Sequence, residues 1–115
     1  MDHTEPALQD CIDACQLCHD HCLTEIAHCL TLGGDHAEPA HINLMMDCAR
    51  VCETTAALML TGSEFYRSQA AVCAEICEAC ARQCQTLGQM DTCVRVCREC
   101  AQQCEQLDVV AAEGA

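Results

Sequence analysis

The sequence contains no lysine and no tryptophan, and it has only one phenylalanine and one tyrosine. Five arginines against eighteen acidic residues give a formal net charge of −13. Nucleic acids and anionic membranes both attract basic surfaces, so we expect neither a nucleic-acid partner nor a membrane partner. No stretch approaches the roughly 20 apolar residues of a membrane span, and the first ten residues lack the features of an export signal. These absences predict a cytoplasmic protein.

Bulky apolar side chains are also scarce, whereas cysteine is abundant, with 15 among 115 residues. The length corresponds to a single domain, 1–115. Alanine and cysteine make up much of the hydrophobic content, and each contributes little buried area. In a reducing compartment these cysteines are expected to be thiols or metal ligands rather than a disulfide framework. The core is therefore expected to hold something other than bulky apolar packing.

Helical periodicity extends along the chain and is interrupted at glycines. Good helix formers fill the segments between the interruptions, and the β-branched runs typical of strands are missing. The predicted helices span about 5–32, 38–61, 64–86 and 91–107, with a frayed tail over 108–115. Because short connections force neighbouring helices to be antiparallel, the expected fold is all-α, an antiparallel up-down-up-down four-helix bundle.

The cysteines recur at gaps of four, three and four in three of the predicted helices, and a C-x3-C pair stands in the second. These gaps place residues on one face of a helix, so each helix presents a seam of thiols to the bundle axis. A core made for stability alone would use Leu and Ile at such positions. We therefore predict a Cys-lined core whose sulfurs are metal ligands: Cys11, Cys15, Cys18, Cys22, Cys29, Cys48, Cys52, Cys73, Cys77, Cys80, Cys84, Cys93, Cys97, Cys100 and Cys104.

Among metals, Cu(I) fits a continuous sulfur seam best. Structural zinc favours separate four-ligand sites built from knuckle loops, and iron–sulfur clusters favour a cysteine run that is missing here. Cu(I) is soft and is satisfied by two thiolates, so bridging predicts multiple Cu(I) ions per chain, about one per cysteine. The predicted function is copper storage or detoxification without enzymatic activity. The alternatives are a thiol-based redox or oxidant buffer and a zinc- or cadmium-binding buffer protein.

The two ends of the expected bundle differ in their residues. At one end we expect His41 and Met45 to bind entering copper, because imidazole and thioether hold Cu(I) more weakly than thiolate does. His28, His36 and Met90 are expected nearby. At the other end Leu8, Met59, Phe65, Tyr66 and Leu107 are expected to form a plug. A single Glu-x-x-His, at Glu25 and His28, falls short of the two copies that a di-iron bundle needs.

The repeated C-x3-C-x2-C-x3-C at Cys11–Cys22, Cys73–Cys84 and Cys93–Cys104, with C-x3-C at Cys48–Cys52, resembles the copper storage proteins over essentially the whole chain. The resemblance implies a Cys-rich four-helix bundle of the cytosolic type that assembles as a homo-tetramer. It also implies loading through an end that carries His and Met. The expected partners are copper ions, with a copper chaperone or a small thiol carrier as the candidate donor.

Overall fold

A computed structural model describes the backbone of residues 5–114 and the side chains of residues 5–107. The helices are α1 (Pro6–Leu32), α2 (Pro39–Leu60), α3 (Tyr66–Leu87) and α4 (Asp91–Gly114). A short helical turn, η1 (Gly34–Ala37), connects α1 to α2. The described backbone is thus helical apart from short connections.

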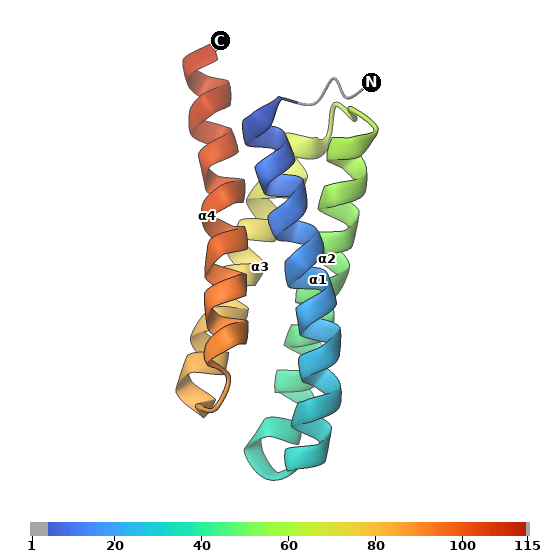
Figure 1. Ribbon diagram of the computed structural model, residues 1–115, viewed down its shortest axis with the longest axis vertical. Helices are drawn as coiled ribbons and strands as arrows, with labels where there is room; N and C mark the ends of the chain where they lie inside the picture. The colour runs from blue at the N-terminus through green and yellow to red at the C-terminus, as the bar shows by residue number, and fades with distance from the viewer. Residues whose placement is uncertain (1–4, 115) are drawn as a thin grey trace.

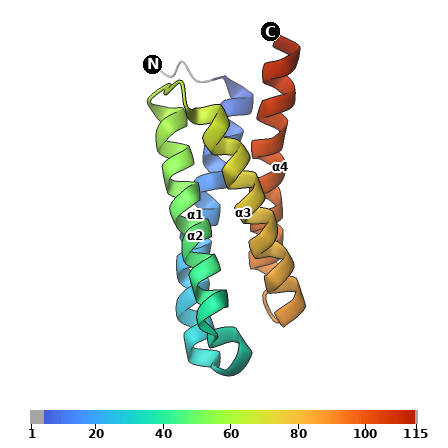
Figure 2. The same ribbon diagram turned by 180° about the vertical axis from the view of Figure 1, so that it is seen from behind.

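The four helices run antiparallel in sequence order (Figures 1 and 2). Each packs against the helix before it and the helix after it, and α1 closes the ring by packing against α4. The α1–α2 and α3–α4 connections lie at one end of the bundle, and the α2–α3 connection lies at the other. This arrangement confirms the predicted up-down-up-down bundle.

Local chemistry explains where the helices begin and end. Pro6 and Pro39 occupy the first position of α1 and α2, where the missing N–H costs no helical hydrogen bond. Gly33 ends α1 with φ of 71°, a conformation that favours glycine, and its N–H donates to the carbonyl of Cys29 at 3.1 Å. Gly88 ends α3 in the same way against Cys84. Both ends thereby fix the backbone of a seam cysteine.

Two boundaries differ from the sequence-based expectation. The structure continues α4 to Gly114, whereas we expected the helix to end near 107 and the tail 108–115 to fray. Alanine and glutamate in this stretch favour helix, and the first strong terminator is Gly114 itself. The third helix begins at Tyr66 instead of 64, because the Ser63 hydroxyl accepts the Phe65 N–H in a turn that precedes the helix.

The core lies along the bundle axis and consists mainly of cysteine, with alanines between the seams and few larger side chains. Ile12, Met45 and Met59 are among the larger buried residues. No helix within the described residues is long and apolar enough to cross a bilayer. The interior surface is therefore predominantly sulfur.

Candidate metal centre

All fifteen cysteines are fully buried, and each is a free thiol. They come from the inward faces of all four helices, as the gaps of four and three predict. Only α2 supplies two instead of four or more, and Met45, Thr55 and Met59 complete its buried stripe. The predicted cysteines are thus brought together in one continuous core.

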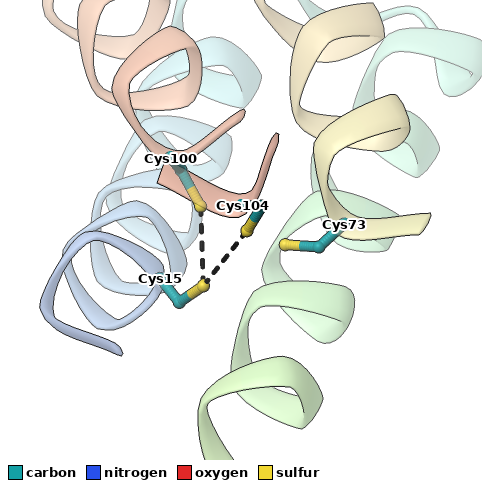
Figure 3. A group of neighbouring side chains, drawn as sticks. All are labelled: Cys15, Cys73, Cys100 and Cys104. Carbon is teal, nitrogen blue, oxygen red and sulfur yellow. Dashed lines mark hydrogen bonds between the residues drawn. The ribbon is translucent and has the colours of Figure 1, made fainter. Parts of the chain in front are cut away.

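At the end where α1 begins, Cys15 connects α1 to α4. Its Sγ lies 3.6 Å from Cys100 Sγ and 3.9 Å from Cys104 Sγ. Cys73 points into the same space from α3 (Figure 3). One layer of the core therefore gathers sulfurs from three helices around a common point.

The same arrangement repeats along the axis. Five groups of four cysteines have all their Sγ atoms within 4.8 Å of one another. Ordered along the bundle, the groups are Cys15/Cys73/Cys100/Cys104, Cys52/Cys73/Cys77/Cys100, Cys18/Cys48/Cys52/Cys77, Cys18/Cys22/Cys48/Cys97 and Cys22/Cys80/Cys93/Cys97. Each group shares two sulfurs with the next, so the sulfurs form an unbroken column.

Two of the three remaining cysteines, Cys11 and Cys84, extend this column at its ends, and the third, Cys29, contacts His41 and Met90 instead. Cys11 Sγ lies 3.5 Å from Cys104 Sγ, and Cys84 Sγ lies 3.6 Å from Cys93 Sγ. Two metal–sulfur bonds of about 2.3 Å span up to about 4.6 Å. A metal ion can therefore bridge such neighbours without movement of the helices.

The thiols also influence one another's ionisation. Hydrogen bonds from Cys104 and Cys15 lower the pKa of Cys11 to about 5. Hydrogen bonds from Cys100 and Cys22 likewise hold the pKa of Cys18 below its ordinary value, whereas donation to Cys18 raises the pKa of Cys22. Adjacent buried thiols cannot all ionise, so some become thiolates that neighbouring thiols stabilise by donation. A metal ion that replaces the protons removes this conflict.

The end of the bundle beside Cys29 carries different donors. His41 is 2% exposed, and its Nε2 lies 3.5 Å from Cys29 Sγ. Met90 Sδ lies 3.9 Å from the same sulfur, and Met45 is buried on α2. Burial, with help from the Glu25 carboxylate, raises the pKa of Cys29 to about 11. Imidazole, thioether and thiol thus meet at this end, which we call the mouth.

Two mouth residues were not among the predicted ligands. Met90 stands three residues before Cys93, which is the next position of the α4 seam, so the gap pattern contained a signal for it. Gln83, whose Oε1 lies 2.8 Å from His41 Nδ1, lies beside the seam and carries no such signal. Neither of the two histidines expected nearby forms a hydrogen bond with a mouth ligand. His36 Nε2 donates to the Gly88 carbonyl, and His28 Nδ1 donates to the Glu25 carboxylate.

The opposite end largely follows the prediction. Met59 and Leu107 are buried there, and Leu8 and Tyr66 pack against the core. Phe65 does not take part, because its side chain is 63% exposed. It precedes α3 in the turn that Ser63 stabilises, which directs it away from the axis.

Chemically, the core is a set of soft donors without water access. Soft sulfur ligands favour Cu(I), Zn²⁺ and iron–sulfur clusters, so charge must decide among them. One Cu(I) per thiolate leaves the interior neutral, whereas Zn²⁺ with four thiolates buries two negative charges. The donor set therefore suits many monovalent soft ions better than a few divalent ones.

Comparison with known proteins identifies several relatives. The sequence matches the family described as "copper storage protein" over residues 4–109. A crystal structure of a Nitrosospira multiformis protein superposes with a TM-score of 0.89 at 46% identity, covering 93% of this chain and 99% of that one. The Cu(I)-bound copper storage protein BsCsp3 superposes with a TM-score of 0.82 at 32% identity, covering 87% and 96%.

A curated relative is the uncharacterized cysteine-rich protein YhjQ of Bacillus subtilis (strain 168). It is 35% identical over 82 residues, which cover 71% of this chain and 72% of the relative. These likenesses extend over most of the bundle.

Proposed function

Because the chain belongs to the copper storage protein family, we propose that its fifteen core thiols bind Cu(I) as thiolates, with about one ion per cysteine. Storage of multiple Cu(I) ions in the cysteine core is the function of this chain. The observation that carries the proposal is the overlap of the five four-sulfur groups. Shared sulfurs are what bridging Cu(I) requires, whereas separate zinc sites need no sharing.

The relationship to a Cu(I)-bound neighbour supports this ligand set. That protein is 32% identical and covers 87% of this chain. Burial supports it further, since every thiol is protected from solvent oxidants. A redox buffer would need exposed thiolates of low pKa, so the alternative of oxidant buffering has no support in the structure.

We propose that copper enters at the mouth, where His41 and Met45 act as ligands together with Cys29 and Met90. The His41 Nε2 lies 3.5 Å from Cys29 Sγ, and the Met90 Sδ lies 3.9 Å from the same sulfur. These donors hold Cu(I) less tightly than bridging thiolates do, so an ion captured here can pass to the thiolate column. The His/Met end thus serves transfer, and the sulfur column serves retention.

We also propose a cellular compartment, an oligomeric state and a copper donor for the protein. A non-enzymatic single domain, 1–115, that works in the reducing cytoplasm keeps its thiols available for copper. Exposed apolar residues such as Leu17, Leu30 and Leu60 offer surface for a homo-tetramer. A copper chaperone or small thiol carrier would deliver the metal, because free Cu(I) is scarce where thiols abound.

The deciding experiment is an anaerobic titration with Cu(I) in competition with a chromophoric chelator. We expect saturation at about one ion per thiol. Saturation at one or two ions would overturn the proposal. A parallel titration with Zn²⁺ tests the zinc-buffer alternative, which predicts tighter retention of Zn²⁺ than of Cu(I).

Loading through the mouth is tested separately by the rate of uptake. His41→Phe should slow transfer of Cu(I) from a weak donor complex while changing the final copper number by no more than one. His19→Phe is the matched control, since His19 lies on the flank of α1 beside α2 and contacts Asp20 and Glu53. Equal rates for the two variants would remove His41 from the entry route.

A further inference from the structure

Glu25 occupies a cysteine position of α1. The seam advances through Cys11, Cys15, Cys18 and Cys22 by gaps of four and three, and the next gap of three arrives at Glu25 before a gap of four reaches Cys29. The Glu25 side chain is only 12% exposed. Burying a carboxylate costs free energy unless it is paired, so its partners require explanation.

Two histidines flank this carboxylate on the same helix. His28 Nδ1 lies 2.9 Å from Glu25 Oε1. Because a carboxylate oxygen only accepts, His28 must carry its proton on Nδ1 and donate it. This bond holds Oε1 on the His28 side and leaves Oε2 facing His21. One end of the carboxylate is therefore satisfied and oriented.

The other carboxylate oxygen, Oε2, meets His21 without a hydrogen bond. His21 Nε2 lies 3.6 Å from Glu25 Oε2, which is too long for a hydrogen bond. This nitrogen is buried and has no hydrogen-bond partner. A buried imidazole nitrogen that has no partner and lies 3.6 Å from a carboxylate oxygen leaves a position between the two atoms for a cation.

The distance of 3.6 Å between His21 Nε2 and Glu25 Oε2 is close to the distance between two ligand atoms of a single metal ion. With bonds of about 2.1 Å and a tetrahedral angle, two ligand atoms stand about 3.4 Å apart. We propose that His21 Nε2 and Glu25 Oε2 bind a divalent metal ion of the Zn²⁺ class, and that His28 orients the carboxylate by its hydrogen bond. His28 is half-exposed, so solvent reaches the site and water can complete the coordination shell.

This site is chemically distinct from the copper column that it adjoins. Imidazole and carboxylate suit Zn²⁺, whereas Cu(I) prefers thiolate and thioether. At about 100° per residue, His21 and His28 lie together on one flank of the α1 seam, and His19 lies on the opposite flank beside Glu53 of α2. The inferred site therefore lies outside the sulfur groups.

His19 provides the natural contrast. Its Nε2 stands 3.5 Å from Glu53 Oε2, a similar distance, but the Glu53 side chain is 71% exposed. Water satisfies an exposed carboxylate at little cost. Of these two pairs, the His21–Glu25 pair is the one that combines ligand spacing with burial and an orienting neighbour.

The test uses protein saturated with Cu(I), so that the thiols are occupied, and Zn²⁺ alone as the probe. Equilibrium dialysis should show one additional Zn²⁺ per chain, and X-ray absorption at the zinc edge should show nitrogen and oxygen ligands without sulfur. Glu25→Gln and His21→Gln should each abolish this binding. His28→Phe should weaken it by about tenfold or more, as loss of an orienting partner does.

His19→Gln is the matched control and should bind Zn²⁺ normally. Unchanged Cu(I) capacity and an unchanged helical circular dichroism spectrum confirm that each variant folds. If Glu25→Gln does not fold, His21→Gln alone decides whether the site exists. Zinc bound by sulfur, or zinc binding that survives both substitutions, overturns the proposal. Absence of any additional zinc in the native chain also overturns it, whatever the copper content.

Discussion

His41 Nδ1 lies 2.8 Å from Gln83 Oε1, while His41 Nε2 faces the Cys29 thiol at 3.5 Å. The carbonyl oxygen of Gln83 accepts a hydrogen bond, so the imidazole proton resides on Nδ1. The lone pair on Nε2 is then directed toward Cys29 and available to a metal. Gln83 of α3 thereby fixes the tautomer of His41 of α2 that can bind a metal ion.

This relationship predicts different effects for two substitutions of Gln83. Gln83→Leu removes the acceptor and should slow Cu(I) uptake by about tenfold, because orienting partners are worth 10–100-fold in metal binding. Gln83→Glu keeps an acceptor and should load at the native rate. Stopped-flow transfer from a weak Cu(I) complex measures both rates, and equal slowing would show that Gln83 acts only through packing.

Cys52 stands near the centre of the sulfur column. Its Sγ lies 3.5 Å from Cys77, 3.8 Å from Cys100 and 3.9 Å from Cys73, and it belongs to two of the four-sulfur groups. Cys52→Ala should therefore reduce the copper number at saturation by more than one ion. Cys11→Ala, at the end of the column, should reduce it by at most one. The number of Cu(I) ions that each variant retains after incubation with a chelator distinguishes the two substitutions.

Copper loading should release protons in a pH-dependent way. Burial raises the pKa of Cys29 to about 11, so this thiol is protonated at neutral pH and copper must displace its proton. The affinity for Cu(I) should therefore fall as the pH is lowered, by about tenfold per pH unit for each proton that the metal displaces. Cys11, with a pKa of about 5, is already ionised and should release none. Because the pKa of Cys18 is also held below its ordinary value, proton release measured in a pH-stat should stay clearly below one per Cu(I).

The apo bundle should depend strongly on its few larger side chains. Ile12 is almost completely buried in a core of cysteine and alanine. Ile12→Ala should lower the free energy of unfolding of the apo protein by about 2–5 kcal/mol. Cu(I) is bridged by sulfurs that only the folded chain brings together, and it should therefore bind the folded chain more tightly than the unfolded one, so loading should recover the loss. Urea titrations with and without Cu(I) test this, and an unchanged apo midpoint would contradict it.

The periodicity of cysteine was sufficient to predict the bundle and its core, because gaps of four and three are a helical signal that tertiary context did not override. The end of α4 was missed because residues 108–113 contain no glycine or proline to end the helix, and the helix before them already has a packed face. Phe65 was misplaced because a turn, set by the Ser63 hydroxyl, rotates it outward.

In the site, too, residues that follow the helical spacing could be predicted, whereas residues whose role depends on a particular side-chain contact could not. Met90 could be predicted, since it occupies the seam register of α4. Gln83 could not, because its role depends on which side of His41 faces α3. Glu25 was read only as half of a di-iron motif, and its value as an oriented, buried carboxylate appears only when the distances to His21 and His28 are known.

The overlap of successive sulfur groups has a consequence for the order of events. A column with its donors for entry at one end, in which each group shares two sulfurs with the next, is filled by ions that pass inward from group to group. It should behave as a stack, in which the last ion to arrive is the first to depart. Loading with ⁶³Cu followed by a final portion of ⁶⁵Cu would reveal this, since the heavier isotope should dominate the earliest copper removed by a chelator.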